Sequence, residues 1–338
     1  MRVYILSRPT GPAGLVQVER PIPEPARGQV LVRMKAASLN YRDLLVAEGR
    51  YGRGELPRDL VPLSDGAGEV VAVGEAVTRV AVGDRVAGLF MQGWLAGALA
   101  PEYAGTALGG VLDGVLADYV LFDQQGLVRL PEHLSYVQGA TLPCAAVTAW
   151  HALFASARPL TAGQQVLLLG TGGVSMFALQ FARAAGAQVI LTSSSDAKLA
   201  RAQALGAHAT INYRTHPEWQ DEVLRLTGGL GVDHVVEVGG AGTLQRSVRA
   251  TRPGGAVHLI GVLSAGDFNP IAVMQRGLVL DGIFVGSREM FEAMNRLLAA
   301  QRLEPLVDRI FAFDEAAAAY RYLATQQHLG KVVISLED

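Results

Sequence analysis

Residues 166–185 constrain the fold of this chain more than any other stretch. They begin with an apolar run that ends at Gly170, which is typical of a strand buried on both faces of a parallel sheet. Apolar residues at helical spacing follow, and Gly186 occupies a position typical of a helix C-terminus. Strand, turn and helix in this order place backbone N–H groups at a helix N-terminus, where they can bind a pyrophosphate.

The turn itself contains three glycines, Gly170, Gly172 and Gly173, which allow a tight bend and close backbone approach to a ligand. Ser175 stands where the dinucleotide fingerprint has its third glycine, so we expect the helix to lie slightly farther from the strand. The alternative is an ordinary strand-to-helix turn, because a glycine-rich turn alone is weak evidence. The order of the elements favours a cofactor site.

Strands and helices alternate after a helical segment at 135–157. We expect strands at 165–170, 188–193, 208–212, 233–238 and 256–262. The intervening helices are expected near 173–185, 196–205, 217–227 and 242–251. This rhythm predicts an α/β fold with a doubly wound parallel sheet of the Rossmann type. A strand at 279–285, helices near 288–301 and 314–325, and a strand at 331–335 complete the pattern.

The first 130 residues have a different texture, with short β-like runs between proline and glycine turns. The runs lie at 2–6, 15–19, 30–36, 68–73, 84–89 and 117–122. Short strands without long helices between them predict a compact β-rich domain. Residues 92–114 show no clear period, and we expect a long loop that shapes a pocket.

Composition and charge limit the classes of protein to consider. Of 338 residues, 50% are hydrophobic, and the formal net charge is −2, so no nucleic-acid partner is expected. The single cysteine, Cys144, excludes an intramolecular disulfide and fits a reducing compartment. The N-terminal residues do not have the pattern of a signal peptide. Residues 86–101 and 164–182 carry little charge, but both contain several glycines and do not resemble a transmembrane segment. We therefore expect no membrane partner and a cytoplasmic location.

Six motifs together resemble the medium-chain dehydrogenase/reductase superfamily. They are Leu-Asn-Tyr-Arg-Asp at 39–43, Pro-Leu-Ser-Asp-Gly-Ala-Gly-Glu-Val at 62–70, Val-Gly-Asp-Arg-Val at 82–86, Leu-Pro-Cys-Ala-Ala-Val-Thr-Ala-Trp at 142–150, Gly-Thr-Gly-Gly-Val at 170–174 and Gly-Lys-Val-Val at 330–333. The resemblance implies a GroES-like catalytic domain at 1–130 and 289–338, and a Rossmann dinucleotide-binding domain at 131–288. It is strongest to the zinc-free quinone oxidoreductase and enoyl reductase branch, although some close relatives are called alcohol dehydrogenases.

The metal ligands of zinc-dependent members are mostly replaced in this sequence. Those members carry Cys-His-x-Asp and Gly-His-Glu, whereas this chain has Asn-Tyr-Arg-Asp at 40–43 and Leu-Ser-Asp at 63–65. Only Cys144 matches a ligand position, and a buried cysteine is otherwise a small apolar residue. A catalytic zinc needs about three protein ligands. We therefore predict no metal site.

The residues expected at the cofactor's ribose favour NADPH over NADH. The strand end at 192–194 has no carboxylate that would repel a 2′-phosphate, and Asp196 comes late enough to occupy an N-terminal helical position. Ser193, Ser194 and Lys198 could receive the phosphate. The resemblance implies that Tyr213 stacks or bonds there. The alternative is a polar loop with a solvated lysine.

Other cofactor contacts are implied by the resemblance alone. Asn40 matches a position that binds the nicotinamide ribose, and Thr148 matches one near the carboxamide. Asn40 could instead cap a turn, and Thr148 could bond within its helix. The remaining positions implied to contact the cofactor are Val174, Gly239, Val262, Val285 and Lys331.

Three side chains are candidates for the reacting end. Tyr51 falls where the enoyl reductases keep a tyrosine that donates a proton or binds substrate, and a phenol can act as a donor at neutral pH. Asn40 and Asp65 are the other catalytic candidates; Asp65 could orient a water or cap a turn. The alternative for Tyr51 is an exposed loop residue, and we interpret Arg42 and Asp43 as a structural pair.

These observations predict that the protein is a zinc-independent reductase of quinones or α,β-unsaturated carbonyls that uses NADPH. One alternative is a zinc-free alcohol dehydrogenase or carbonyl reductase. Another is an NADPH-binding protein with little turnover. The apolar segment 278–285 is expected at a sheet margin, where members of the superfamily pair with a second copy. We therefore expect a homodimer, with a monomer as the alternative.

Overall fold

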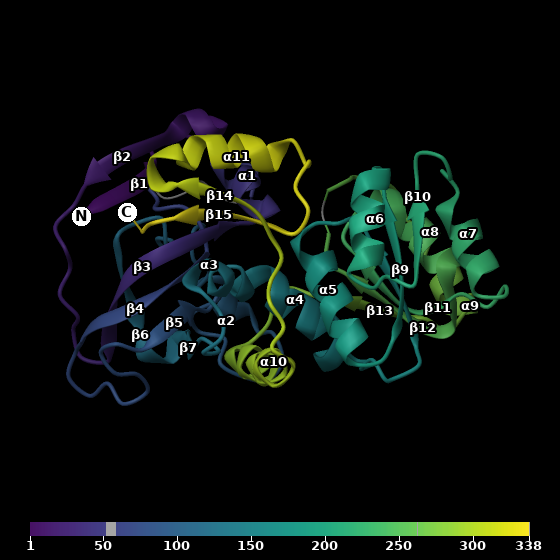
Figure 1. Ribbon diagram of the computed structural model, residues 1–338, viewed down its shortest axis with the longest axis horizontal. Coiled ribbons are helices and arrows are strands. Elements are labelled where there is room, and N and C mark those ends of the chain that lie inside the picture. The colour runs from purple at the N-terminus through teal and green to yellow at the C-terminus, as the bar shows by residue number, and fades with distance from the viewer. Residues whose placement is uncertain (52–58, 262, 338) are drawn as a thin grey trace. The chain divides into compact units, whose positions relative to one another are not determined.

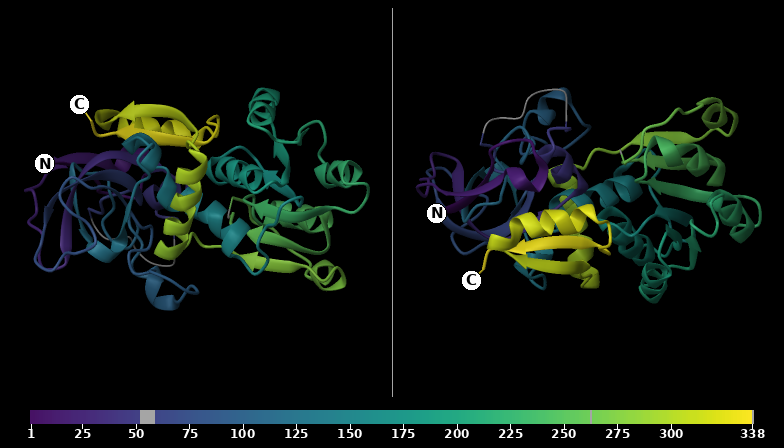
Figure 2. Two further views of the ribbon diagram at one scale, coloured as in Figure 1. Left: turned by 60° about the horizontal axis from the view of Figure 1, so that its bottom comes forward. Right: turned by 90° about the horizontal axis from the view of Figure 1, so that it is seen from above.

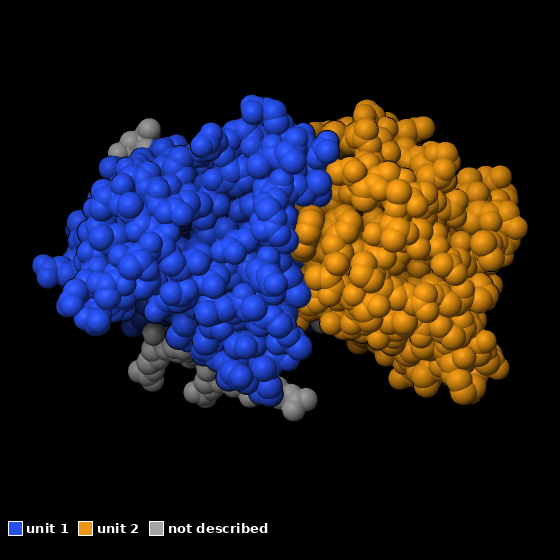
Figure 3. Space-filling view, turned by 90° about the horizontal axis from the view of Figure 1, so that it is seen from below, with its two compact units in different colours: residues 1–147, 286–338 blue, residues 148–285 orange. Residues whose placement is uncertain are grey.

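The computed structural model describes residues 1–51, 59–261 and 263–337. It forms two compact units, Met1–Val147 with Gly286–Asp338, and Thr148–Val285, which are coloured separately in Figure 3. No helix within the described ranges is both long and apolar enough to cross a membrane.

The unit Thr148–Val285 contains a six-stranded parallel sheet in the order β10-β9-β8-β11-β12-β13, counted over its described residues. The strands are β8 (Gln165–Leu169), β9 (Gln188–Ser193), β10 (Ala209–Asn212), β11 (Val232–Glu237), β12 (Thr251–Leu259) and β13 (Val279–Gly282). The helices are α5 (Gly173–Ala184), α6 (Asp196–Ala204), α7 (Trp219–Leu226), α8 (Ala241–Ala250) and α9 (Ile271–Gln275), drawn around the sheet in Figure 1. The predicted doubly wound Rossmann sheet is confirmed, and its strand order reverses between β8 and β11.

Burial on both faces explains why β8 is an unbroken apolar run. Leu167 belongs to a core cluster with residues of α7 and α8, and its neighbours Val166 and Leu168 are fully buried on the opposite side of the strand. After α5, Gly186 has a φ of 77°, the left-handed conformation that commonly ends a helix.

The other unit contains a seven-stranded sheet in its described part, in the order β14-β15-β3-β4-β5-β7, with β6 pairing β3. These strands are β3 (Gln29–Leu39), β4 (Asp65–Val73), β5 (Arg85–Gly88), β6 (Tyr119–Asp123), β7 (Leu127–Arg129), β14 (Val307–Ala312) and β15 (Lys331–Ser335); β1 (Arg2–Leu6) pairs separately with β2 (Leu15–Glu19). Because β15 runs antiparallel to β3, the end of the chain returns to the first domain. The predicted β-rich domain is confirmed.

The helices of this unit include one, α11 (Ala316–Ala324), that closes the core. Others are α1 (Tyr41–Ala47), α2 (Pro101–Ala104), α3 (Tyr136–Gly139) and α10 (Arg288–Gln301). The apolar face of α11, including Ala319, Tyr320 and Leu323, packs into the same core as β3 and β15, and Figure 2 shows α11 alongside β14 and β15.

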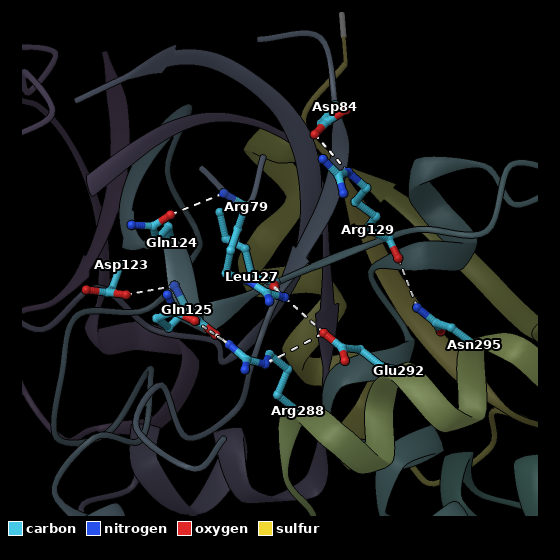
Figure 4. A network of polar contacts seen from close by, with 10 residues as sticks. All are labelled: Arg79, Asp84, Asp123, Gln124, Gln125, Leu127, Arg129, Arg288, Glu292 and Asn295. Carbon is cyan, nitrogen blue, oxygen red and sulfur yellow. Dashed lines mark hydrogen bonds and ion pairs between the residues drawn. The ribbon is translucent and has the colours of Figure 1, made fainter. Parts of the chain in front are cut away.

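A polar network attaches α10 to the strands of the same unit (Figure 4). Arg79 lies 2.9 Å from Glu292, and Arg288 lies 3.6 Å from the same carboxylate oxygen. Arg288 also donates to the backbone oxygen of Gln125 at 3.0 Å and to its side chain at 2.7 Å. These bonds fix the segment that follows the return of the chain from the Rossmann unit.

The helical segment predicted at 135–157 is interrupted. Helix α3 is followed by a π-helical turn η3 (Leu142–Ala146), the short helix α4 (Val147–Trp150) and a second π-helical turn η4 (His151–Ala155). Pro143 lies in the first turn of η3, where its missing N–H is tolerated. The two compact units divide after Val147, whereas a domain boundary was expected after residue 130; Cys144, before this division, donates its backbone N–H to Asp65 of β4.

Two further elements differ from the sequence analysis. The strand expected at 279–285 ends at Gly282, and it could not include Val285, whose φ of 55° no strand accommodates. The segment 92–114 is mostly irregular, as expected, but includes α2 and two isolated bridges. Helix α1 and strand β14 were not anticipated.

Candidate active site

The glycine turn between β8 and α5 has the geometry of an anion site. Gly170 has a φ of 71°, which favours glycine, and Gly172 is the N-terminal cap of the 12-residue helix α5. A Cβ atom on either glycine would meet no heavy atom within 4 Å, so the space beside the turn is open. Gly173 and Val174 form the first turn of α5, where N–H groups have no helical partner. The turn therefore fits the pyrophosphate of a dinucleotide.

Ser175 occupies the position of the third fingerprint glycine and makes a hydrogen bond to the preceding strand. Its hydroxyl donates to the backbone oxygen of Leu169 at 2.7 Å, and the side chain is buried. This bond ties the first turn of α5 to the end of β8. From the sequence, Ser175 was expected only to set α5 slightly farther from β8.

The carboxyl ends of β9 and β10 bring together two predicted ribose-phosphate residues. The backbone N–H of Tyr213 donates to the backbone oxygen of Ser193 at 3.1 Å, and the Tyr213 ring is partly exposed. Ser194 follows Ser193, and Lys198 lies on the first turns of α6. Asp196 is the first residue of that helix, as predicted.

The carboxylate of Asp196 already has a partner. The side-chain amide of Asn212 donates to it at 2.7 Å, so Asp196 is held beside β10. The strand end at 192–194 carries three hydroxyl side chains and no carboxylate; Thr192 and Ser193 are buried, and Ser194 is partly exposed.

A buried carboxylate organises the loop that follows β11. Glu237 accepts hydrogen bonds from the backbone N–H groups of Gly239 at 2.7 Å and Gly240 at 3.0 Å. It also accepts from the hydroxyls of Thr243, at 2.7 Å, and Ser247. Gly239 is one of the predicted cofactor positions, and Glu237 holds its loop. In the sequence, Glu237 is recognisable only as an acidic residue at the end of an apolar strand, and it was not among the predicted site residues.

Three other predicted cofactor positions belong to the Rossmann unit. Thr148 is buried on α4, and Val285 is buried beyond the end of β13. Val262 lies outside the described residues.

In the other unit, Lys331 fixes the side chain of Asn40. Its ammonium group donates to the backbone oxygen of Leu39 and to Oδ1 of Asn40, both at 2.6 Å. Because an ammonium group only donates, Oδ1 must face Lys331 and Nδ2 must face away. This Nδ2 is buried and has no partner among the described residues. A buried unpaired donor is costly, so it fits an acceptor on a ligand such as a ribose hydroxyl.

Asn40 is also the N-terminal cap residue of α1. Its backbone N–H donates to the Asp43 carboxylate at 2.7 Å, and Arg42 lies 3.6 Å from the other carboxylate oxygen. Burial raises the pKa of Asp43 to about 6, although Arg42 and the Asn40 N–H favour the ionised form. The structural pair of Arg42 and Asp43 is confirmed.

Arg42 also orients Tyr51. Its guanidinium carbon lies 4.6 Å from the centre of the Tyr51 ring and 4.8 Å from the centre of the Phe90 ring. The guanidinium group donates to the backbone oxygen of Leu108 at 3.0 Å. Tyr51 is half-buried and packs against the core of this unit, so it is not the fully exposed loop residue considered as its alternative.

Asp65 is engaged by protein groups on both carboxylate oxygens. The hydroxyl of Ser64 donates to one oxygen at 2.7 Å, and the backbone N–H of Cys144 donates to the other at 2.9 Å. Asp65 and Ser64 are fully buried, and the preceding Leu63 has a left-handed φ of 69°. Burial, with the neighbouring charge of Asp65, raises the pKa of the Cys144 thiol above its usual range.

This donor set does not suit a metal ion. Where the zinc-dependent enzymes have ligands, the chain has the Asn40 amide, whose oxygen is held by Lys331, the Ser64 hydroxyl, which is bonded to a carboxylate, and a single thiol, Cys144. Within the described ranges, no group of three or more His, Cys, Asp or Glu side chains is placed to hold a metal.

A Rossmann sheet with an open glycine turn, and a β-rich domain in which the Nδ2 of Asn40 has no described partner, are features expected of a nicotinamide-dependent oxidoreductase. Residues 26–132 match the family model described as alcohol dehydrogenase GroES-like domain, and residues 173–300 match the one described as zinc-binding dehydrogenase. A zinc-type alcohol dehydrogenase-like protein of Schizosaccharomyces pombe is 45% identical over 92% of this chain and 91% of its own length.

Two solved structures extend the comparison. An NAD-dependent alcohol dehydrogenase is 35% identical, with a TM-score of 0.90 and all of both chains covered. The quinone oxidoreductase of Coxiella burnetii is 27% identical, with a TM-score of 0.81, covering 100% of this chain and 99% of that one. The chain belongs to the medium-chain dehydrogenase/reductase superfamily, whose members are oxidoreductases that bind a nicotinamide cofactor.

Proposed function

We propose that this protein is a zinc-independent, NADPH-dependent reductase of quinones or α,β-unsaturated carbonyls. The observation that carries the proposal is the arrangement around Asp65, where Ser64 and the Cys144 N–H occupy both carboxylate oxygens. Without a metal ligand set, the protein must stabilise charge on a substrate oxygen with hydrogen-bond donors. Conjugated acceptors suit this arrangement, because their soft β-carbon accepts a hydride with less Lewis-acid assistance than a simple carbonyl needs.

Each unit contains residues that suit a part of the cofactor. The glycine turn with Gly170, Gly172 and Gly173 fits its pyrophosphate, and the Nδ2 of Asn40 fits a ribose hydroxyl. When bound, reduced nicotinamide supplies the hydride. The absence of a carboxylate at 192–194, together with Lys198, supports NADPH rather than NADH.

Tyr51 is the proposed donor to the substrate oxygen. Arg42 stacks on its ring and so limits the directions in which the phenol can point. Asn40 is proposed to bind cofactor, oriented by Lys331. Asp65 is proposed to fix the positions of the Ser64 hydroxyl and the Cys144 backbone. The substrate is proposed to be a small apolar molecule in the cytoplasm.

A second function has specific support. The S. pombe relative and the NAD-dependent structure are both called alcohol dehydrogenases. A zinc-free enzyme acting directly on a C=O/CHOH pair, with Tyr51 near the reacting oxygen, would reconcile those names with the donor set of this chain.

A substrate panel distinguishes the two functions. Quinones, enones, aldehydes and alcohols would be compared by the absorbance of NADPH, with and without a chelator, alongside metal analysis of the protein. We expect quinones or enones to be reduced fastest, with activity that survives chelation and far less than one zinc per chain. Faster oxidation of saturated alcohols would favour the second function, and stoichiometric zinc that survives dialysis would overturn zinc independence.

A further inference from the structure

His151 makes a short hydrogen bond to the backbone of Val285. Its Nδ1 lies 2.7 Å from the Val285 oxygen, and both residues belong to the Rossmann unit. A carbonyl oxygen only accepts, so Nδ1 must carry the proton. His151 begins the π-helical turn η4, one helical turn after Thr148, and π-helical turns are frequent at functional sites.

Val285 has a backbone conformation that a branched residue avoids. Its φ of 55° lies in the left-handed region, and its side chain is buried. A non-glycine residue persists there only when its surroundings impose the conformation. The hydrogen bond from His151 is such a constraint, because it holds the Val285 carbonyl in one direction.

The strand order indicates which part of the cofactor this segment serves. Val285 follows β13, and the sheet order reverses between β8 and β11. A dinucleotide bound across this reversal has one half towards β9 and β10, where Ser193 and Tyr213 meet, and its other half towards β12 and β13. The nicotinamide half would therefore lie on the side of Val285.

We infer that His151 is a positioning residue for the nicotinamide end of the cofactor, because it holds Val285 in the left-handed turn at that end. The inference rests on the cofactor binding included in the proposed function. It concerns neither the substrate nor the reacting groups. His151 acts through Val285 and need not touch the cofactor.

Two matched substitutions test the bond. The Nδ2 of asparagine can reach the position of histidine Nδ1, whereas the Nε2 of glutamine corresponds to histidine Nε2. Dissociation constants would be measured for NADPH and for 2′,5′-ADP, which lacks nicotinamide. We expect His151→Gln to weaken NADPH binding about tenfold with little effect on 2′,5′-ADP. His151→Asn should retain most of the NADPH affinity.

A second comparison, of His151→Gln in the presence and absence of the Val285 side chain, tests the backbone strain. In a Val285→Gly background the left-handed conformation carries no side-chain penalty, so His151→Gln should weaken NADPH binding less than it does beside Val285. Thermal unfolding would accompany each measurement. If His151→Gln is unstable beside Val285, glutamine and asparagine at position 151 are compared in the Val285→Gly background instead.

Several outcomes would overturn the inference. One is an unchanged NADPH affinity in His151→Gln. Another is an equal loss of affinity for NADPH and for 2′,5′-ADP in that variant. A third is an NADPH affinity that is the same with glutamine as with asparagine at position 151. Native protein that binds neither nicotinamide cofactor would overturn the proposed function itself. Equal binding of NADPH and NADH would overturn only the cofactor preference, and the same comparison would then use NADH against 5′-AMP.

Discussion

Arg42 shows how one buried side chain can connect structure with the proposed chemistry. It contacts Asp43, the Leu108 carbonyl and the rings of Tyr51 and Phe90. These contacts distribute its charge over a carboxylate, a backbone dipole and two aromatic faces, which is how a buried cation is tolerated. Tyr51 therefore contributes a ring to stability and a hydroxyl to the proposed reaction.

The first prediction separates these two contributions. Tyr51→Phe removes the hydroxyl but keeps the ring that stacks on Arg42. We expect kcat on enones to fall about 10²–10³-fold, as for loss of one oxyanion donor, with little change in NADPH affinity or Tm. Tyr41→Phe, at a partly exposed tyrosine of α1, is the matched control. An unchanged kcat would remove Tyr51 from the mechanism, and a detectable semiquinone would then indicate one-electron chemistry on quinones.

The second prediction concerns Lys198 and the cofactor phosphate. Native protein should bind NADPH at least about tenfold more tightly than NADH, a difference of about 1.4 kcal/mol. Lys198→Ala should reduce this difference, because it should weaken the binding of NADPH but not of NADH. Lys198→Arg should preserve the difference, because it keeps the positive charge that attracts the 2′-phosphate. Titration calorimetry with both cofactors measures the effect. Equal affinities in the native protein would contradict the preference.

At the scale of elements, β11 and β12 carry a pair of stacked, buried histidines. Nδ1 of His234 lies 3.1 Å from Nε2 of His258, and Nε2 of His234 lies 3.0 Å from the side-chain oxygen of Gln164. The arrangement is satisfied if His258 donates to His234 and His234 donates to Gln164. Both rings are then neutral, and a further proton on His258 would have no acceptor among the described residues.

The surroundings of the pair oppose protonation. Burial lowers the pKa of His234 to about 4, with Asp233 opposing this shift and Arg252 and Arg158 adding to it. Burial, followed by the charges of His234 and His151, lowers the pKa of His258 to about 3. An unfolded histidine has a pKa of about 6.5, so between that pH and about 4 the unfolded chain binds more protons than the folded one.

The third prediction follows from this difference in bound protons. The free energy of unfolding should decrease as the pH falls from about 6.5 towards 4, by up to about 1.4 kcal/mol per pH unit for each histidine. His258→Gln keeps a donor towards His234 and removes one titrating group, so its unfolding should depend less steeply on pH. Denaturant unfolding at pH 5.5–7.5 compares it with native protein and with His208→Gln, at an exposed histidine. Parallel pH profiles for all three would contradict the prediction.

At the scale of the whole molecule, the edge strand β13 and helix α9 carry exposed apolar side chains. Over the described residues β13 pairs with β12 alone, and Met274 and Leu280 are 74% and 38% exposed. Ile271 and Phe284 are also exposed. An apolar, unpaired strand edge usually needs a cover, and a second copy of the chain can provide one with twofold symmetry.

The fourth prediction is that the protein is a homodimer through this edge. Light scattering at micromolar concentration should give twice the mass of one chain. Met274→Glu combined with Leu280→Glu should shift the protein towards monomer, because two charges would be buried at the interface. Val82→Glu, at an exposed apolar residue of the other unit, should have no effect. A monomeric mass for native protein would refute the dimer.

The sequence by itself determined the architecture, because the architecture depends on local patterns. The runs at 2–6 and 15–19 are β1 and β2, and the apolar run before Gly170 is the buried strand β8. Glycine positions and alternating periods record backbone conformation and burial within a few residues. Short or weakly patterned elements, such as α1 and β14, lack enough periodicity to be recognised.

Only the tertiary structure decided how the polar residues of the site are used. Lys331 reaches Asn40 across 291 positions because β15 pairs with β3, and the Cys144 N–H reaches Asp65 across 79 positions. The same holds for His151 and Val285, which are 134 positions apart. A sequence shows that these groups are present, but their partners are set by strand pairing and packing, and those partners determine which atoms remain available to a ligand.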